Sequence, residues 1–571
     1  MKKDTKVFNS RFSPALRIAS ALLVALMVLP SCASGPASVT TEPPTDAVTD
    51  TTDVVTTEEP KVEVPAEPVV IDISTSLYDK VTEPTSTVTI TEKVINTVNP
   101  LIFGNNMSWR FEGFGLWDKE NNKPYDLLMD ALKNSGITSF RWPAGIEGDY
   151  CHWYEMIGEK RVPQLDPFTS KNKFWGMAYK AYPYFGLEEF IDVCDQLGIP
   201  AVIQLNCGNG TPEEAADLVK YCVDNGFNVS SFCVGNEMHM GEEMIDGIKV
   251  TKKPAEYVDF YLKTYELLGD YADKVELGCV GLTDEHSISY FKNWDKEVLP
   301  ALSDKIDFVD AHIAYSPYTS QTGEYTNEDF IKCYLASAYY IEEMIDQQLL
   351  NIDNYCMDNK DDITLQITEY GTLGKHSNSM AGAAFIGALL GVMTEEPRIS
   401  SANHFSAILI YESSPTLVGY KWDGNQLKVF DNAMSYVFRW YSAQSGRNVL
   451  RTKVTCDDFS TKKTGLIPAL YGAPTIYCNT YIDEKTGEGS IIIVNANYKK
   501  NEMTDITLPF GFEITDVAEV YSIDPLSMNS STAKAVTEKH YTPEFTTCAD
   551  GKLTVSTKPV SVVKIDFVKS K

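Results

Sequence analysis

Two glutamates, Glu237 and Glu369, stand where strand-like apolar runs end. Glu237 follows the run 232–235 and is preceded by Asn236, whereas Glu369 closes the run 363–369. Cleavage of a glycosidic bond needs two carboxyl groups, one protonated to donate to the leaving oxygen and one ionised to attack the anomeric carbon. A lone glutamate at a strand end is usually a solvated rim carboxylate, so it is the joint placement of the two that favours catalysis.

Between about residues 98 and 446, eight strand-like runs alternate with amphipathic helix-like segments. This alternation is typical of a parallel sheet closed on itself, a (β/α)8 TIM barrel. The strand-like runs are 101–104, 138–142, 201–206, 232–235, 275–280, 308–312, 363–369 and 405–411. The helix-like segments lie near 124–135, 187–197, 212–224, 254–271, 287–300, 328–348, 379–393 and 426–443. An open doubly wound sheet is the rival fold, but no GxGxxG or phosphate-binding loop follows any of these strands.

Other polar and aromatic residues stand at or just beyond the ends of the same runs. Because active sites of such barrels lie at the C-terminal ends of the strands, we expect these residues to share one cavity with the two glutamates. They are Trp109, Arg141, Trp142, Asn206, His312 and Tyr315. The indoles of Trp109 and Trp142 could stack on sugar faces or belong to the core. Arg141 and His312, taken singly, could equally be satisfied polar core residues.

The chain beyond residue 446 has a different pattern. Short strand-like runs at 475–481, 489–496, 504–508, 517–521, 552–555 and 561–567 are separated by turn residues. This pattern favours a C-terminal β-sandwich over residues 447–571. The segment 71–97 is also strand-like, and we expect it to join that sandwich. The predicted barrel itself covers residues 98–446.

The N-terminus reads as an export signal. Basic residues precede an apolar run, 18–29, that is too short to span a bilayer comfortably. The run ends in Leu29-Pro30-Ser31-Cys32, which resembles a bacterial lipobox, although an ordinary signal peptide with an incidental cysteine is the alternative. We therefore expect a signal peptide over 1–31, lipid attachment at Cys32, a disordered tether over 32–70, and a membrane-anchored location on the bacterial cell surface.

Charge and cysteine spacing exclude other classes of function. With 79 acidic against 49 basic residues, the chain carries a formal charge of −30, which makes nucleic acid a poor partner. The eleven cysteines beyond Cys32 are scattered and form no CxxC pair, so neither zinc ligation nor a disulfide framework is indicated. We expect buried, unreactive thiols, and neither a metal nor a cofactor.

The quoted motifs resemble glycoside hydrolase clan A, and most closely the α-L-arabinofuranosidases of family 51. The similar stretches are Asn99–Gly104, Phe140–Gly145, His152-Trp153, Leu205–Ala215 and Gly235–Met238. The resemblance implies a retaining enzyme in which Glu237 is the general acid/base and Glu369 the nucleophile. It further implies that Asn236 hydrogen-bonds the sugar 2-hydroxyl and that Tyr315 holds Glu369, while Arg141 is the cation expected to keep Glu369 ionised.

The chain also departs from the family. Ile146 stands where the family has a substrate-contacting asparagine, and Glu112 matches the family's substrate-binding acid only by position. The sequence therefore predicts a retaining glycoside hydrolase acting on plant-type polysaccharides or oligosaccharides, with α-L-arabinofuranose as the expected sugar. A β-glycanase or β-xylosidase of the same clan, a non-catalytic glycan-binding lipoprotein, and a metal-dependent hydrolase using Asp310 and His312 remain alternatives.

Overall fold

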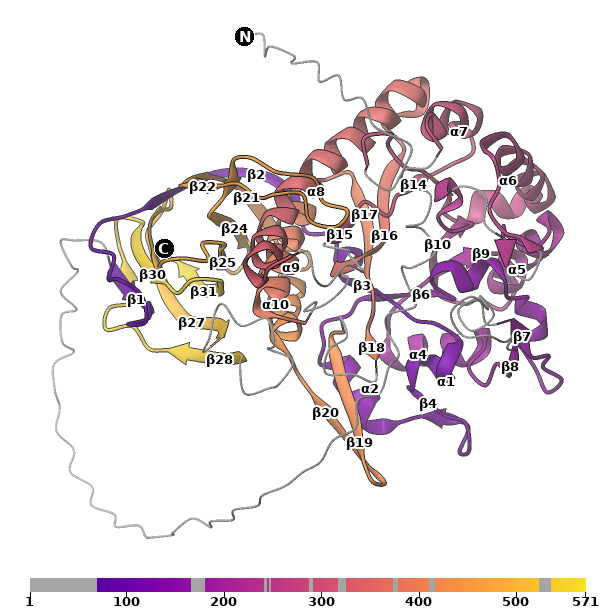
Figure 1. The fold of residues 1–571 in the computed structure, drawn as a ribbon, viewed down its shortest axis with the longest axis horizontal. Helices are drawn as coiled ribbons and strands as arrows, with labels where there is room; N and C mark the ends of the chain where they lie inside the picture. The colour runs from indigo at the N-terminus through magenta and orange to yellow at the C-terminus, as the bar shows by residue number, and fades with distance from the viewer. Residues whose placement is uncertain are drawn as a thin grey trace.

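A closed parallel barrel forms the larger part of the molecule (Figure 1). The computed structural model describes residues 69–165, 180–240, 244–245, 248–286, 291–316, 325–372, 378–409, 416–522 and 536–570. Its barrel strands are β3 (Gly104–Asn106), β6 (Ser139–Trp142), β9 (Ala201–Leu205), β10 (Val229–Val234), β13 (Leu277–Val280), β14 (Phe308–Asp310), β16 (Thr364–Thr372) and β17 (Ile399–His404). The sheet closes because β17 pairs with β3 and β14 pairs with β16.

Helices surround the barrel and largely follow the predicted segments. They are α2 (Asp126–Lys133), α4 (Leu187–Leu197), α5 (Pro212–Asp224), α6 (Pro254–Leu268), α7 (Trp294–Leu302), α8 (Asn327–Tyr355), α9 (Met380–Glu395) and α10 (Ala433–Ser442). Helix α5 begins as its sequence dictates, because the Thr211 side chain accepts a hydrogen bond from the Glu214 amide and Pro212 occupies the first turn. The predicted fold class is confirmed.

Two predicted strands lie elsewhere. The run 101–104 is mostly the 3-10 turn η3 (Pro100–Phe103), because Asn99 caps it and Pro100 fixes its first residue, so β3 starts only at Gly104. The eighth strand is β17 rather than 405–411. Its residues, Ile-Ser-Ser-Ala-Asn-His, resemble a loop in composition, yet both of its neighbours satisfy its backbone within the closed sheet.

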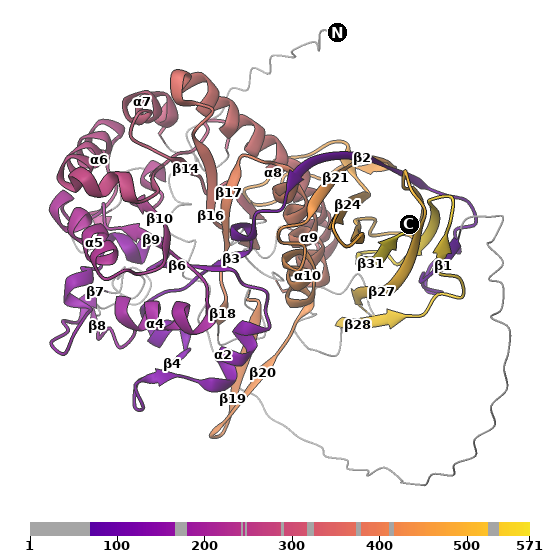
Figure 2. The same ribbon diagram turned by 180° about the vertical axis from the view of Figure 1, so that it is seen from behind.

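The first two described strands and the C-terminal strands form a second, curled sheet beside the barrel (Figure 2). Its members are β1 (Val69–Asp72), β2 (Ser86–Thr97), β21 (Asn448–Thr455), β24 (Ile476–Ile482), β25 (Glu488–Asn495), β26 (Glu502–Thr507), β27 (Phe512–Ser522), β28 (Val536–Tyr541), β29 (Thr547–Cys548), β30 (Lys552–Thr557) and β31 (Ser561–Lys569). Strand β1 pairs with β30, and β2 lies between β26 and β21. The N-terminal segment is thus an integral part of this sheet.

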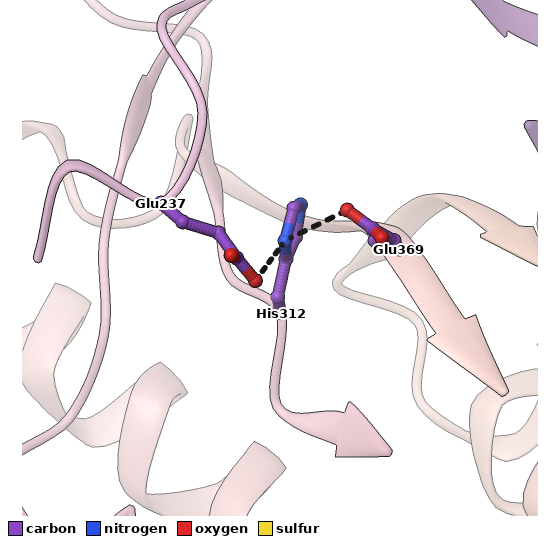
Figure 3. A group of neighbouring side chains, drawn as sticks. All are labelled: Glu237, His312 and Glu369. Carbon is purple, nitrogen blue, oxygen red and sulfur yellow. Dashed lines mark hydrogen bonds and ion pairs between the residues drawn. The ribbon is translucent and has the colours of Figure 1, made fainter. Parts of the chain in front are cut away.

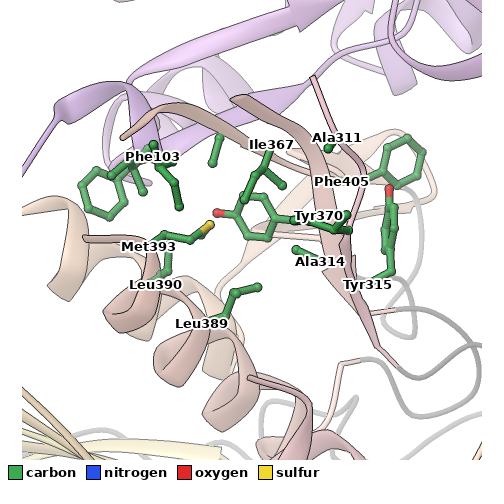
Figure 4. Packing of buried hydrophobic residues seen from close by; sticks show 14 of the residues in the cluster. Phe103, Ala311, Ala314, Tyr315, Ile367, Tyr370, Leu389, Leu390, Met393 and Phe405 are labelled. Atoms are coloured by element: carbon green, nitrogen blue, oxygen red, sulfur yellow. The ribbon is translucent and has the colours of Figure 1, made fainter. Parts of the chain in front are cut away.

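Helix α9 lies between the barrel and the curled sheet, as both views of the ribbon show. It is buried on almost every side, in keeping with its apolar, glycine-rich sequence. Figure 4 shows Leu389, Leu390 and Met393 of α9 packed around the Tyr370 ring of β16. The core that supports the end of β16 therefore continues into the second domain.

Long loops follow the carboxyl ends of the barrel strands and carry elements of their own. After β3 come α1 (Arg110–Phe114) and the hairpin β4 (Trp117–Asp118) and β5 (Lys123–Pro124). After β6 comes the pair β7 (Gln164–Leu165) and β8 (Lys180–Ala181), and after β17 come β18 (Ile408–Leu409), β19 (Val418–Asp423) and β20 (Gln426–Phe430). These loops cover the end of the barrel where substrates bind in such folds.

Residues 1–68 lie outside the described part of the chain, and with them the predicted signal segment, Cys32 and the tether. A search of the described helices finds none that is both long and apolar enough to cross a lipid bilayer. The eleven cysteines from Cys151 to Cys548 form no disulfide bonds with one another, and all except the half-buried Cys456 are buried.

Candidate active site

A tight turn presents Glu237 at the end of β10. The turn begins at Gly235, whose φ of 82° suits glycine, and Glu237 itself has a φ of 42°. A non-glycine residue in this region carries a strain of roughly 1–3 kcal/mol, and such strain concentrates at functional positions. The strained turn follows directly on a fully buried strand end, so the position of the carboxyl group is fixed by the barrel.

His312 lies between the two glutamates (Figure 3). Its Nδ1 atom is 3.0 Å from Glu237 Oε1 and 3.3 Å from Glu369 Oε2. One carboxylate oxygen of each glutamate and one ring nitrogen of His312 all lie within 4.8 Å of one another. Retaining glycosidases hold their carboxyl groups about 5–5.5 Å apart, whereas inverting enzymes leave a wider gap for water. The spacing is therefore suited to direct attack by a carboxylate.

The buried carboxylate of Asp310 fixes the orientation of the His312 ring. Thr368 Oγ1 donates to Asp310 Oδ2 at 2.6 Å, and the Thr368 amide donates to Asp310 Oδ1 at 3.1 Å. Because this hydroxyl already donates to Asp310, it accepts from the Nε2–H of His312, at 3.2 Å. Nε2 therefore carries a hydrogen, and Nδ1 faces the glutamates.

Arg141 and Tyr315 hold Glu369 from two sides. The fully buried Arg141 guanidinium lies 3.6 Å from Glu369 Oε2 and donates to Asn236 Oδ1 at 2.8 Å. The Tyr315 hydroxyl donates to Glu369 Oε1 at 2.6 Å. Arg141 is positioned in turn by Asn106 Oδ1 at 3.1 Å and Gln204 Oε1 at 3.2 Å. The cation thus links Glu369 to the asparagine that precedes Glu237.

The charges of the site interact strongly. Burial lowers the pKa of the His312 imidazole, but the carboxylates of Asp310, Glu369 and Glu237 outweigh it and raise the pKa to about 10. Burial raises the pKa of Glu237, yet the hydrogen bond from His312 and the nearby cations bring it below the usual value. Burial and the charge of Glu237 raise the pKa of Glu369, against the opposing effect of His312 and Arg141. The raised pKa of His312 and the lowered pKa of Glu237 together favour the proton on His312 over Glu237.

The structure brings together six of the predicted residues and places the other four apart from them. Those that meet are Asn236, Glu237, Glu369, Arg141, His312 and Tyr315. Trp142 instead stacks on Phe190 of α4, with ring centroids 5.9 Å apart, because its side chain points to the helix layer. Asn206 uses its amide between loops, donating to the Cys151 carbonyl in the loop after β6 and to Asn209 Oδ1 in its own loop.

The two predicted residues of the first loop lie elsewhere. Trp109 is 1% exposed and belongs to the core. Glu112 is on the outer rim, where its carboxylate pairs with Lys119 at 2.9 Å. The buried acid of this region is Glu147, which accepts from the Ser108 hydroxyl at 2.9 Å and lies 3.9 Å from Arg110 Nη1.

The predicted site residues did not include Asn106, Gln204, Thr368 or Glu147. Gln204 interrupts the otherwise apolar strand β9, and that interruption is the signal that would have identified it, whereas Asn106 and Thr368 lie in strands with several other polar residues. A metal-dependent enzyme was one of the alternatives. Among the described residues, the acidic, histidine or cysteine side chains close enough together to bind one metal ion are those of Glu237, His312 and Glu369. The carboxylates around His312 raise its pKa to about 10, so a metal bound through Nδ1 would have to displace a proton, which weakens metal binding near neutral pH.

Comparison with known proteins gives a consistent assignment. No protein-family profile matches the chain. It is 22% identical over 436 residues to an intracellular exo-α-L-arabinofuranosidase from Bacteroides ovatus, covering 70% of this chain and 78% of the relative. It is also 22% identical over 488 residues to an intracellular exo-α-(1→5)-L-arabinofuranosidase from Streptomyces lividans, covering 76% and 67%. The structure of a family 51 α-L-arabinofuranosidase from Bifidobacterium longum superposes with a TM-score of 0.69 at 18% identity, covering 85% of this chain and 100% of the other.

The predicted resemblance to glycoside hydrolase family 51 is confirmed. The same likenesses bear out the predicted enzyme class, a glycoside hydrolase. The superposition on the Bifidobacterium longum enzyme covers 85% of the chain, so the similarity of fold includes both the barrel and the curled sheet.

The predicted location is wrong. Both relatives bear names that describe intracellular enzymes, which contradicts a lipid-anchored protein on the cell surface. The prediction depended on the mainly apolar run 18–29 and one cysteine, Cys32, a local pattern that is independent of the folded domains. A membrane partner is likewise unsupported by the comparisons.

Proposed function

We propose that this family 51-like glycoside hydrolase is a retaining α-L-arabinofuranosidase that removes arabinofuranosyl residues from plant-type polysaccharides or oligosaccharides. Glu237 is the general acid/base and Glu369 the nucleophile. The observation that carries the proposal is the close approach of the two carboxyl groups around His312. One oxygen of each group and one ring nitrogen of His312 lie within 4.8 Å of one another. The names of the relatives support arabinofuranose as the sugar.

In the first step, an oxygen of Glu369 attacks the anomeric carbon, and the bond to the leaving oxygen breaks as that oxygen takes the proton of Glu237. The product is a glycosyl ester of Glu369. In the second step, the Glu237 carboxylate takes a proton from water, the water oxygen attacks the anomeric carbon, and Glu369 leaves as a carboxylate. Each step inverts the anomeric centre, so the overall reaction retains its configuration.

The proton that Glu237 needs comes from His312. The Nδ1 proton has 3.0 Å to cross to Glu237 Oε1, and the ring that remains keeps its Nε2–H on Thr368. Transfer leaves Glu237 neutral and ready to donate. Glu369 then keeps the contacts of Tyr315 and Arg141, both of which favour its ionised form. Substrate binding drives this transfer, because a neutral sugar displaces water from around the charged glutamate.

Substitution of each glutamate separates their roles. Glu369→Gln removes the nucleophile and is expected to abolish turnover of every substrate. Glu237→Ala is expected to retain turnover of a nitrophenyl arabinofuranoside, whose leaving group needs no proton, and to gain rate on addition of azide. Glu484→Gln, which changes an exposed glutamate in the turn between β24 and β25, is the matched control and should behave as wild type.

The stereochemistry of the product tests the mechanism independently. Proton NMR of the first product formed should show the anomeric configuration of the substrate. An inverted product, or a wild-type rate in Glu369→Gln, contradicts the proposal. A panel of nitrophenyl arabinofuranosides, xylosides and glucosides tests the sugar, and a preference for a pyranoside would favour the β-xylosidase or β-glycanase alternative.

A further inference from the structure

We propose that Phe111, Tyr182 and Tyr184 form an aromatic platform that binds the main chain of the glycan, apart from the pocket that takes the scissile sugar. The three rings are 46%, 41% and 39% exposed. The inference rests on the proposed function, because it assigns to the same enzyme a second contact with its carbohydrate. The expected occupant is a chain of pyranose rings.

The platform lies at the catalytic end of the barrel. Phe111 belongs to the loop after β3, and Tyr182 and Tyr184 belong to the loop after β6. Both loops follow the carboxyl ends of barrel strands, as Glu237 and Glu369 do. Figure 1 shows α1, which contains Phe111, on the same side of the barrel as β4 and β8.

A left-handed turn holds Phe111 outward. Phe111, Glu112 and Phe114 have φ values of 49°, 54° and 54°, so three non-glycine residues share a conformation that L-residues rarely adopt. The turn packs on the next loop, since a Cβ atom on Gly113 would lie 3.1 Å from the Phe185 ring. Strain of this kind persists where the surroundings impose it and marks functional positions. Here it directs a phenyl ring into solvent.

Tyr182 and Tyr184 are held rigidly. Their ring centroids are 4.7 Å apart, and the Tyr184 amide donates to the Tyr182 carbonyl across Pro183. Arg161 donates to the Pro183 carbonyl at 3.0 Å and is itself fixed by Glu189 at 2.6 Å. Two tyrosines on a braced turn bind with little loss of conformational entropy, as binding surfaces require.

A charged pair connects the two loops. Lys119 Nζ lies 5.1 Å from the centroid of the Tyr184 ring and 2.9 Å from Glu112 Oε1. Glu112 adjoins Phe111 in the sequence, so the aromatic rings have a cation and a carboxylate beside them. A pyranose ring presents an apolar C–H face together with hydroxyl groups at its edge. The aromatic rings can stack on the C–H face, and the charged pair can hydrogen-bond the hydroxyl groups. For this reason the proposed occupant is a carbohydrate chain.

The test compares a long substrate with a short one. Tyr182→Ala/Tyr184→Ala should lower kcat/KM on arabinoxylan about tenfold, mainly through KM, as expected on losing two stacking rings. The nitrophenyl arabinofuranoside has no main chain to contact the platform and should change less than twofold by the same reasoning. Tyr471→Ala, which removes a tyrosine that is 75% exposed in the C-terminal part of the chain, is the matched control.

Three results would overturn the platform: no change on arabinoxylan, an equal loss on both substrates, or a loss confined to linear arabinan, whose main chain is furanose. Binding separates this proposal from the proposed function. Retardation of the Glu369→Gln protein in native gels containing arabinoxylan needs no turnover. If wild type fails to cleave arabinofuranosides but the double tyrosine variant still loses retardation, the platform stands and the proposed activity fails.

Discussion

Replacing Tyr315 by phenylalanine tests how the protein keeps Glu369 ready to attack. The Tyr315 hydroxyl donates a 2.6 Å hydrogen bond to Glu369 Oε1. Its ring is buried between the barrel strands and packs near Phe405, as Figure 4 shows, and phenylalanine preserves that ring. The substitution therefore removes a single hydrogen bond to a carboxylate.

The expected effect follows from that bond. A hydrogen bond to a charged group contributes about 1.5–3 kcal/mol, so its loss in the transition state lowers kcat/KM roughly 10- to 150-fold. The bond also lowers the pKa of Glu369, against the raising effects of burial and of Glu237. Without it the pKa of Glu369 rises further. Because attack needs the ionised form, the acidic limb of the pH–rate profile should move to higher pH.

The assay is the pH dependence of kcat/KM on a nitrophenyl arabinofuranoside, for wild type and Tyr315→Phe in parallel. Thermal unfolding of both proteins checks that the fold is intact. A loss below threefold with an unmoved acidic limb would show that Tyr315 does not control Glu369, and the reasoning would fail. A large loss without a shift of the limb would mean that the hydroxyl contacts the sugar instead.

Two further predictions concern the metal alternative and the closure of the barrel. Dialysis against EDTA should leave activity unchanged, because the two-glutamate mechanism uses no metal and the raised pKa of His312 disfavours coordination through Nδ1; restoration of lost activity by a divalent cation would reverse this conclusion. Gly104→Ala should destabilise the protein by about 1–3 kcal/mol and lower Tm in a thermal melt, because its Cβ would meet the Ser139 and Asn403 side chains and lie 2.8 Å from the Ala402 carbonyl oxygen; an unchanged Tm would contradict that tight closure.

The barrel could be predicted because its signals are local. Thr211-Pro212 starts a helix by capping and by the fixed φ of proline, and the apolar run 201–205 has the composition of a strand buried on both faces. The eighth strand lacks such a signal. Ser400, Ser401 and Asn403 have no preference for a strand, and β17 forms because the closing sheet offers hydrogen bonds on both sides.

The difference between local signals and long-range contacts also explains which predicted site residues meet in the structure and which do not. A residue within a barrel strand, such as Glu369 in β16, has a direction that the alternation of the strand determines, so its place could be inferred. Glu112 lies six residues beyond β3, in a turn whose left-handed backbone no pattern of residue types indicates. That turn directs its carboxylate to Lys119 on the rim. Position in the chain predicts where a side chain lies only as far as regular backbone extends, and beyond that point the contacts between loops decide.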